Sequence, residues 1–285
     1  MARKVSVVVI SDVHLGTYGC HATELLNYLK SIEPKILVLN GDIIDAWQFS
    51  KSYFPHTHFE VINEIFKKVA KGTRVVYITG NHDEFLRRYS DMEVGNILLT
   101  DKFLLNIDNK KTWIFHGDVF DNTTKGAAKI LAKLGGKGYD FLILLNSMVN
   151  ACLKILGKNK VSFSKRVKNS VKKAVAYINK FETTIAELAI EKNYDYVVCG
   201  HIHQPCIKEI ETNAGKVQYL NSGDWVENLS ALEYNNGNWE LYQYNATDFA
   251  EQTIERALKK APEANIEADI FKYIHYSQSI NHKSV

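Results

Sequence analysis

The sequence predicts an α/β fold with a functional site outside the ends of its strands. Three observations support this: short apolar runs rich in β-branched residues, helical patterns between the first of them, and a turn with Asp, Asn or His after each run. The runs are residues 5–10, 36–39, 75–78, 112–115, 196–199 and 217–220. Buried strands with polar residues at their ends are typical of an open α/β sheet.

Helical periodicity accounts for most of the remaining chain. Residues 23–30 and 59–70 each place apolar side chains on one face, and we expect Pro34 and Gly72 to close these two regions. In the second region the apolar positions are Val61, Ile62, Ile65, Phe66 and Val69. Further helical patterns cover residues 127–134, 141–156, about 164–190, 248–260 and 264–276.

Length and composition suit a folded α/β protein. A chain of 285 residues can form one large domain or two smaller ones. Its four cysteines have no C-x-x-C spacing, so we expect no disulfide framework and a reducing, cytoplasmic setting. The apolar run near the N-terminus is too short for a signal peptide and continues into Ser11 and Asp12, so we interpret it as the first strand.

Basic charge is concentrated in one internal segment. Residues 121–180 contain thirteen Lys and Arg but only Asp121 and Asp140 as acids, whereas the whole chain has a net charge of +3. Within this segment, residues 141–156 are strongly apolar and lysines follow them. This pattern is typical of an element at a membrane surface, or of one that binds a ligand with acyl and phosphate parts. A buried core helix remains an alternative, and no motif supports nucleic-acid binding.

The polar residues at the strand ends are metal-ligand types. Carboxylate, amide and imidazole ligands without cysteine suit Mn²⁺ (manganese), Fe²⁺ or Zn²⁺. Seven ligands are too many for one ion that keeps an open position, and they match two ions that share a carboxylate. Such a pair promotes in-line displacement at phosphorus, with a metal-activated hydroxide as the nucleophile. The candidate ligands are Asp12, His14, Asp42, Asn81, His116, His201 and His203.

Five motifs in order, D-x-H, G-D-x-x-D, G-N-H-D, H-G-D and G-H-x-H, resemble the calcineurin-like metallophosphoesterase superfamily over about residues 5–245, apart from the helical insertion. The resemblance implies a sandwich of two mixed β-sheets flanked by helices. It also implies that Asp12, His14 and His203 hold one ion, that Asn81, His116 and His201 hold the other, and that Asp42 bridges them. His82 would contact the phosphate or assist the leaving group. The expected domains are residues 1–245, a helical, basic lid insertion within them at 121–190, and a helical tail at 246–285.

A narrower resemblance comes from G-D-I-I-D-A-W, from H-G-D-V-F-D and from the basic insertion that follows. These are similar to the UDP-2,3-diacylglucosamine diphosphatases of lipid A biosynthesis. The resemblance implies Mn²⁺-dependent pyrophosphate hydrolysis to the lipid monophosphate (lipid X) and UMP, peripherally at the cytoplasmic face of the inner membrane. The expected substrate-binding residues are Asn81, His82, Asp45, Trp47, Lys165, Arg166 and Lys168.

One residue departs from that branch, because His82 stands where Arg is common. A metallophosphodiesterase or phosphatase for nucleotides is therefore an alternative, and a non-catalytic scaffold is a third. Asp45 and Asp118 can each support a ligand or simply shape a turn. The oligomeric state stays open. We expect the remaining histidines to be surface residues: His21, His56, His58, His275 and His282.

Overall fold

The computed structural model describes residues 2–46, 53–123 and 163–249. Several predictions fall outside this part. They concern Trp47, His275, His282, the helical patterns at 127–134, 141–156 and 264–276, and all but the first two residues of the pattern at 248–260. The side chains of Lys165, Arg166 and Lys168 also lie outside the description. The chain divides into two compact units, residues 1–243 and 244–285. Only residues 244–249 of the second unit are described, and they include a short 3-10 helix, η3 (Ala246–Phe249).

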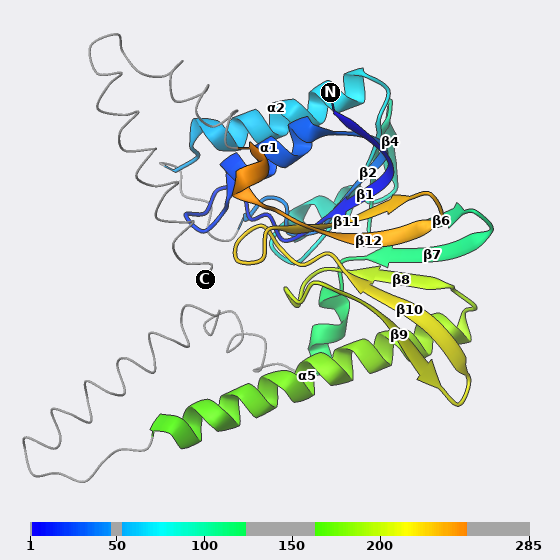
Figure 1. Cartoon of the computed structure of the whole chain (residues 1–285). Coiled ribbons are helices and arrows are strands. Elements are labelled where there is room, and N and C mark those ends of the chain that lie inside the picture. Colours follow the sequence, from blue (N-terminus) through cyan, green and yellow to red (C-terminus); the bar gives the residue numbers. More distant parts are fainter. Residues whose placement is uncertain (1, 47–52, 124–162, 250–285) are drawn as a thin grey trace, which may run out of the picture. The chain divides into compact units, whose positions relative to one another are not determined.

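The first unit contains a seven-stranded mixed sheet (Figure 1). Its strand order is β12-β11-β1-β2-β3-β5-β4, with parallel pairing from β1 through β2 and β3 to β5 and antiparallel pairing elsewhere. The strands are β1 (Arg3–Ile10), β2 (Ile32–Asn40), β3 (Arg74–Ile78), β4 (Met92–Val94), β5 (Ile97–Thr100), β11 (Ser230–Asn235) and β12 (Asn238–Gln243).

A second, five-stranded sheet has the order β6-β7-β8-β10-β9. Strands β7, β8 and β10 are parallel neighbours, and β6 and β9 pair antiparallel at the two edges. The strands are β6 (Lys102–Ile107), β7 (Lys110–Phe115), β8 (Tyr196–Cys199), β9 (Cys206–Thr212) and β10 (Gly215–Asn221). The prediction of two mixed sheets is confirmed.

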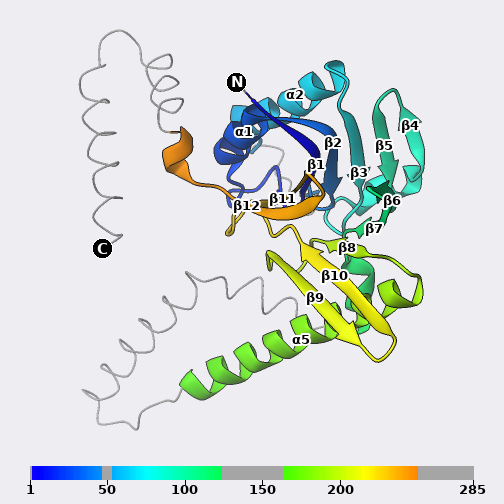
Figure 2. The same ribbon diagram turned by 45° about the vertical axis from the view of Figure 1, so that its right-hand side comes forward.

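The two sheets pack face to face through apolar side chains. Val7, Val38 and Val76 of the larger sheet share a buried cluster with Ile114 and Val198 of the smaller one. Because side chains alternate along a strand, the neighbouring residues point to the opposite face. Helices α1 (Ala22–Ser31) and α2 (His56–Ala70) cover that face of the larger sheet (Figures 1 and 2).

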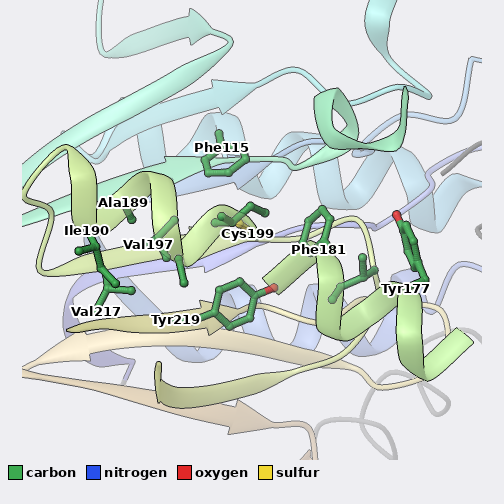
Figure 3. Packing of buried hydrophobic residues seen from close by; sticks show 12 residues of the cluster. Phe115, Tyr177, Phe181, Ala189, Ile190, Val197, Cys199, Val217 and Tyr219 are labelled. Atoms are coloured by element: carbon green, nitrogen blue, oxygen red, sulfur yellow. The ribbon is translucent and has the colours of Figure 1, made fainter. Parts of the chain in front are cut away.

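Helix α5 (Phe163–Glu191) covers the outer face of the smaller sheet (Figure 3). Phe181, Ala189 and Ile190 of the helix are buried together with Val197 and Tyr219 of the sheet. The layers of the first unit are therefore helices, sheet, sheet and helix. No helix in the described part of the chain is long and apolar enough to cross a membrane.

Two expectations for the first elements are wrong. Pro34 does not precede the second strand but lies within β2, which pairs with β1 from Ile32 and with β3 only from Ile36. Proline lacks a backbone N–H, so it is tolerated where a strand has a neighbour on one side only. In α2, Phe66 is not part of the buried face, because 56% of it is exposed.

His58 is also not a surface residue. It is buried, and its Nδ1 accepts a hydrogen bond of 2.9 Å from the backbone N–H of Gly16. Burial lowers the pKa of His58, which favours the neutral ring that can accept this bond. His58 thereby supports the loop that follows His14. By contrast, His21 and His56 are exposed as expected.

Candidate metal centre

The fold brings the predicted ligands to one edge of the two sheets. Asp12 and His14 follow β1, Asp42 follows β2 and Asn81 follows β3, which are parallel neighbours in the larger sheet. His116 follows β7, and His201 and His203 follow β8, which are parallel neighbours in the smaller sheet. Since parallel strands end at the same edge, loops from both sheets can contribute to one site.

Backbone conformation distinguishes most of these residues. Five of the seven have positive φ angles between 51° and 66°, a region that residues other than glycine seldom adopt. Such residues concentrate at functional sites, where the surrounding structure fixes them. The five are Asp12, His14, Asp42, His201 and His203.

The first group of ligands comprises Asp12, His14 and His203, each with a ligand atom within 4.8 Å of those of the others. The Nε2 of His203 lies 3.1 Å from Oδ1 of Asp12. The other oxygen of Asp12 accepts a hydrogen bond of 3.0 Å from the backbone N–H of His201. Asp12 therefore links this group to His201, which belongs to the second group.

The second group comprises Asp42, His116 and His201. The Nε2 of His116 lies 3.3 Å from Oδ2 of Asp42, and its Nδ1 lies 2.9 Å from the carbonyl oxygen of Asn40. The Nδ1–H therefore donates to that carbonyl, which leaves Nε2 for an ion. The side-chain oxygen of Asn81 is buried and has no hydrogen-bond partner among the described residues, as expected of a ligand that faces a cation.

Two glycines permit the close approach of these loops. A Cβ atom at Gly41 would overlap the ring of His116, and one at Gly80 would overlap the carboxylate of Asp42. Gly41 also has a φ of +80°. The glycines of G-D-x-x-D and G-N-H-D are thus required by the space around His116 and Asp42.

Asp45 lies between two imidazoles. Its Oδ2 is 3.2 Å from Nδ1 of His14 and 3.0 Å from Nδ1 of His82, and the residue is 1% exposed. This is the placement of a carboxylate that orients both rings. The His82 side chain is partly exposed beside them. Direct contact of Asp45 with substrate stays a prediction.

Asp118 and Asp83 also connect loops of the site. Oδ2 of Asp118 forms an ion pair of 3.0 Å with Arg87 of the 3-10 helix η1 (Glu84–Tyr89), so Asp118 fixes the start of η2 (Asp118–Thr123) against η1. Asp83 is buried and accepts hydrogen bonds from the backbone N–H groups of Gly80 and Ile43. The sequence pattern alone gives Asp83 no role of its own, although its place in G-N-H-D points to the site.

The charges of the site compensate each other. Burial alone would raise the pKa of Asp42, but the adjacent His116 lowers it to about 2. Burial alone would lower the pKa of His203, but Asp12 raises it to about 9. Without a metal ion, protonated imidazoles therefore neutralise ionised carboxylates. Divalent cations can replace these protons, and this donor set fits them.

Two groups of mixed oxygen and imidazole side chains at the edge of paired sheets can hold metal ions, and the family match and the relatives below identify a metal-dependent hydrolase. The chain belongs to the calcineurin-like phosphoesterase family, whose model matches residues 5–205.

Curated relatives match most of the chain. A UDP-2,3-diacylglucosamine hydrolase from Blochmanniella pennsylvanica is 26% identical over 247 residues, which cover 83% of this chain and 94% of that protein. The protein of the same name from Aliivibrio fischeri is 23% identical over 84% of this chain and 98% of its own. The solved structure of an archaeal phosphodiesterase matches 83% of this chain and 98% of its own, with 14% identity and a TM-score of 0.39.

Proposed function

We propose that the protein hydrolyses the pyrophosphate bond of UDP-2,3-diacylglucosamine and releases UMP and the lipid monophosphate. The observation that carries this proposal is the extent of the similarity to the two hydrolases of that name, which spans more than four fifths of this chain and of each of them. The similarity is therefore not limited to the short metal motifs. We further propose that Mn²⁺ is the metal and that the enzyme works peripherally at the cytoplasmic face of the membrane that holds its lipid substrate.

The proposed metal ligands follow the two groups. Asp12, His14 and His203 would hold one ion, His116, His201 and Asn81 would hold the other, and Asp42 would be shared between them. When bound, the two ions supply positive charge at the phosphoryl oxygens and lower the pKa of water. The chain's own contribution is to fix the donors and to keep their charges balanced in a buried site.

His82 is the proposed catalytic group beside the metal ligands. Its Nδ1 faces Asp45, which leaves Nε2 to donate a hydrogen bond to a phosphoryl or leaving oxygen. Burial lowers the pKa of His82, but the hydrogen bond with Asp45 and the charge of Asp42 outweigh that effect and raise it. A protonated ring suits this role.

The test is UMP release from UDP-2,3-diacylglucosamine by the full chain with Mn²⁺. We expect turnover by the wild-type protein and none by Asn81→Ala, with circular dichroism showing that the variant folds. If the wild-type protein cleaves simple phosphodiesters but leaves this glycolipid intact, the lipid substrate is wrong and only the reaction class stands.

A second candidate is a metallophosphodiesterase for soluble nucleotides, and His82 favours it because Arg is common at this position in the lipid A branch. Comparison of acylated with deacylated UDP-glucosamine separates the two. A glycolipid enzyme should strongly prefer the acylated compound, whereas a nucleotide enzyme should cleave both at similar rates.

A further inference from the structure

The turn after β10 contributes none of the seven candidate ligands. It nevertheless lies at the same edge of the sheets as they do, because β10 runs parallel to β8. It carries Asp224, which is fully buried. Oδ1 of Asp224 accepts hydrogen bonds from the backbone N–H groups of Val226, Glu227 and Asn228. One carboxylate oxygen therefore holds the backbone of the turn, and the other, Oδ2, accepts a hydrogen bond of 2.5 Å from the side-chain amide of Asn228.

That other oxygen, Oδ2, faces His203. It lies 3.8 Å from Nδ1 of His203, while Nε2 of the same ring lies 3.1 Å from Asp12. The imidazole therefore stands between two carboxylates, one at each nitrogen. A histidine that binds a metal through Nε2 must carry its proton on Nδ1, and a carboxylate near Nδ1 favours that tautomer.

The same turn holds the backbone around the first ligand group. The side-chain amide of Asn228 donates to the carbonyl oxygen of His203 at 3.0 Å, and the backbone N–H of Trp225 donates to the carbonyl oxygen of Asp12 at 3.1 Å. Both carbonyls belong to residues with positive φ. The turn thus contacts two of the three ligands in this group.

We propose that Asp224 is a positioning residue, which orients the His203 ring for metal binding and, through the turn it stabilises, fixes the backbone of Asp12 and His203. This inference rests on the metal assignment above. It predicts that loss of the Asp224 charge weakens the binding of one metal ion and leaves the binding of the other unchanged.

The test is Mn²⁺ titration of metal-free protein by calorimetry, with Asp224→Asn as the variant. Asparagine keeps an oxygen for the backbone hydrogen bonds, but it removes the charge and the oxygen that accepts from the side-chain amide of Asn228. We expect about 10- to 100-fold weaker binding of one ion and unchanged binding of the other. In the Co²⁺-loaded protein we also expect faster solvent exchange of one paramagnetically shifted imidazole N–H signal, the one that His203→Ala removes.

The matched control is Glu233→Gln. Glu233 is also a buried carboxylate, but it pairs with Arg3 and Tyr28 away from the ligands, so its loss should lower stability and leave both ions bound as before. If Asp224→Asn does not fold, Asn228→Ala replaces it, with a smaller loss expected at the same ion.

The proposal is overturned if the Asp224 variant binds both ions equally more weakly, or if it binds both as tightly as the wild-type protein. His203→Ala separates this failure from failure of the metal assignment. If His203→Ala loses one ion while Asp224→Asn loses none, the assignment stands and Asp224 has no positioning role. If His203→Ala also keeps both ions, the assignment itself is wrong.

Discussion

His116 and His203 both present Nε2 to a carboxylate, but different surroundings fix the two rings. His116 is almost completely buried, its Nδ1 donates to the carbonyl of Asn40, and Gly41 lies against its ring. His203 has a side chain that is 34% exposed, and its Nδ1 faces the carboxylate of Asp224. Packing and a neutral acceptor therefore hold the second ligand group, whereas charged partners hold the first. We expect the second group to respond to added volume and the first to changes in charge.

The largest effect should come from Gly41→Ala, which adds a methyl group where the His116 ring lies. Overlap together with the positive φ should cost about 3 kcal/mol of unfolding free energy and displace the second ion. Denaturant unfolding and metal content measure the two effects. Gly72→Ala is the control, because it also has a positive φ but nothing within 4 Å, and it should cost about 1 kcal/mol with both ions retained.

A charge change next to the first group, at Asp45, should have the next largest effect. Asp45→Asn removes the negative charge between His14 and His82, and we expect activity to fall by about 10- to 100-fold. Steady-state kinetics measure the loss. Asp101→Asn is the control, since Asp101 also pairs with a cation, Arg87, but its side chain is 46% exposed. A fall of the same size in the control would show that the effect is not specific to Asp45.

Metal binding should depend on pH through the imidazoles. The pKa of His203 is raised to about 9, so the ring is protonated at pH 7.5 in the metal-free protein and must lose its proton to bind an ion. Affinity should therefore rise with pH up to about 9, by about tenfold per pH unit for each proton released. Calorimetry in buffers of different ionisation enthalpy counts these protons. The His203→Asn variant should release fewer protons on metal binding. An unchanged number of released protons would show that they do not come from His203.

The smallest effect concerns His58, which supports the loop behind His14. Its pKa is lowered by burial, so the unfolded chain binds a proton more readily than the folded one. Stability from this residue is therefore complete above about pH 6.5 and is lost as the pH falls towards the folded-state pKa. We expect a change of about 1 kcal/mol. His58→Asn keeps an acceptor near Gly16 without titrating, so its stability should vary less with pH over this range.

The central strands were predictable because they are buried on both faces and therefore form continuous apolar runs. β11 was not, since its buried residues include Ser230 and Glu233, and Glu233 is satisfied by Arg3 and Tyr28, more than 200 positions away. Edge strands such as β4 are short, and all three residues of β4 are exposed, so no apolar run marks this strand. A pattern of apolar residues identifies a strand only where apolar side chains are buried. The side chains of β4 are exposed, and β11 buries polar side chains as well as apolar ones.

For the site, the structure brings six of the seven candidate ligands into two groups and leaves the oxygen of the seventh, Asn81, buried. These candidates could be identified in the sequence because each follows a strand within one to four residues. The contact of Asp83 with Ile43 and the whole role of Asp224 could not be predicted, because these partners are distant in sequence. Asp83 binds the backbone of Ile43, 40 positions earlier, and Asp224 faces His203 from another loop. Such contacts exist only after both sheets have formed.

The hydrogen bond between Asp12 and His201 joins residues 189 positions apart. An ion shared by Asp12, His14 and His203 would act there as a reversible cross-link between the beginning of the chain and its last third. A covalent link that closes a loop of this length removes about 5 kcal/mol of unfolded-chain entropy, which sets the scale. The metal supply of the cell would then govern how long the folded protein survives proteolysis, as well as how fast it works.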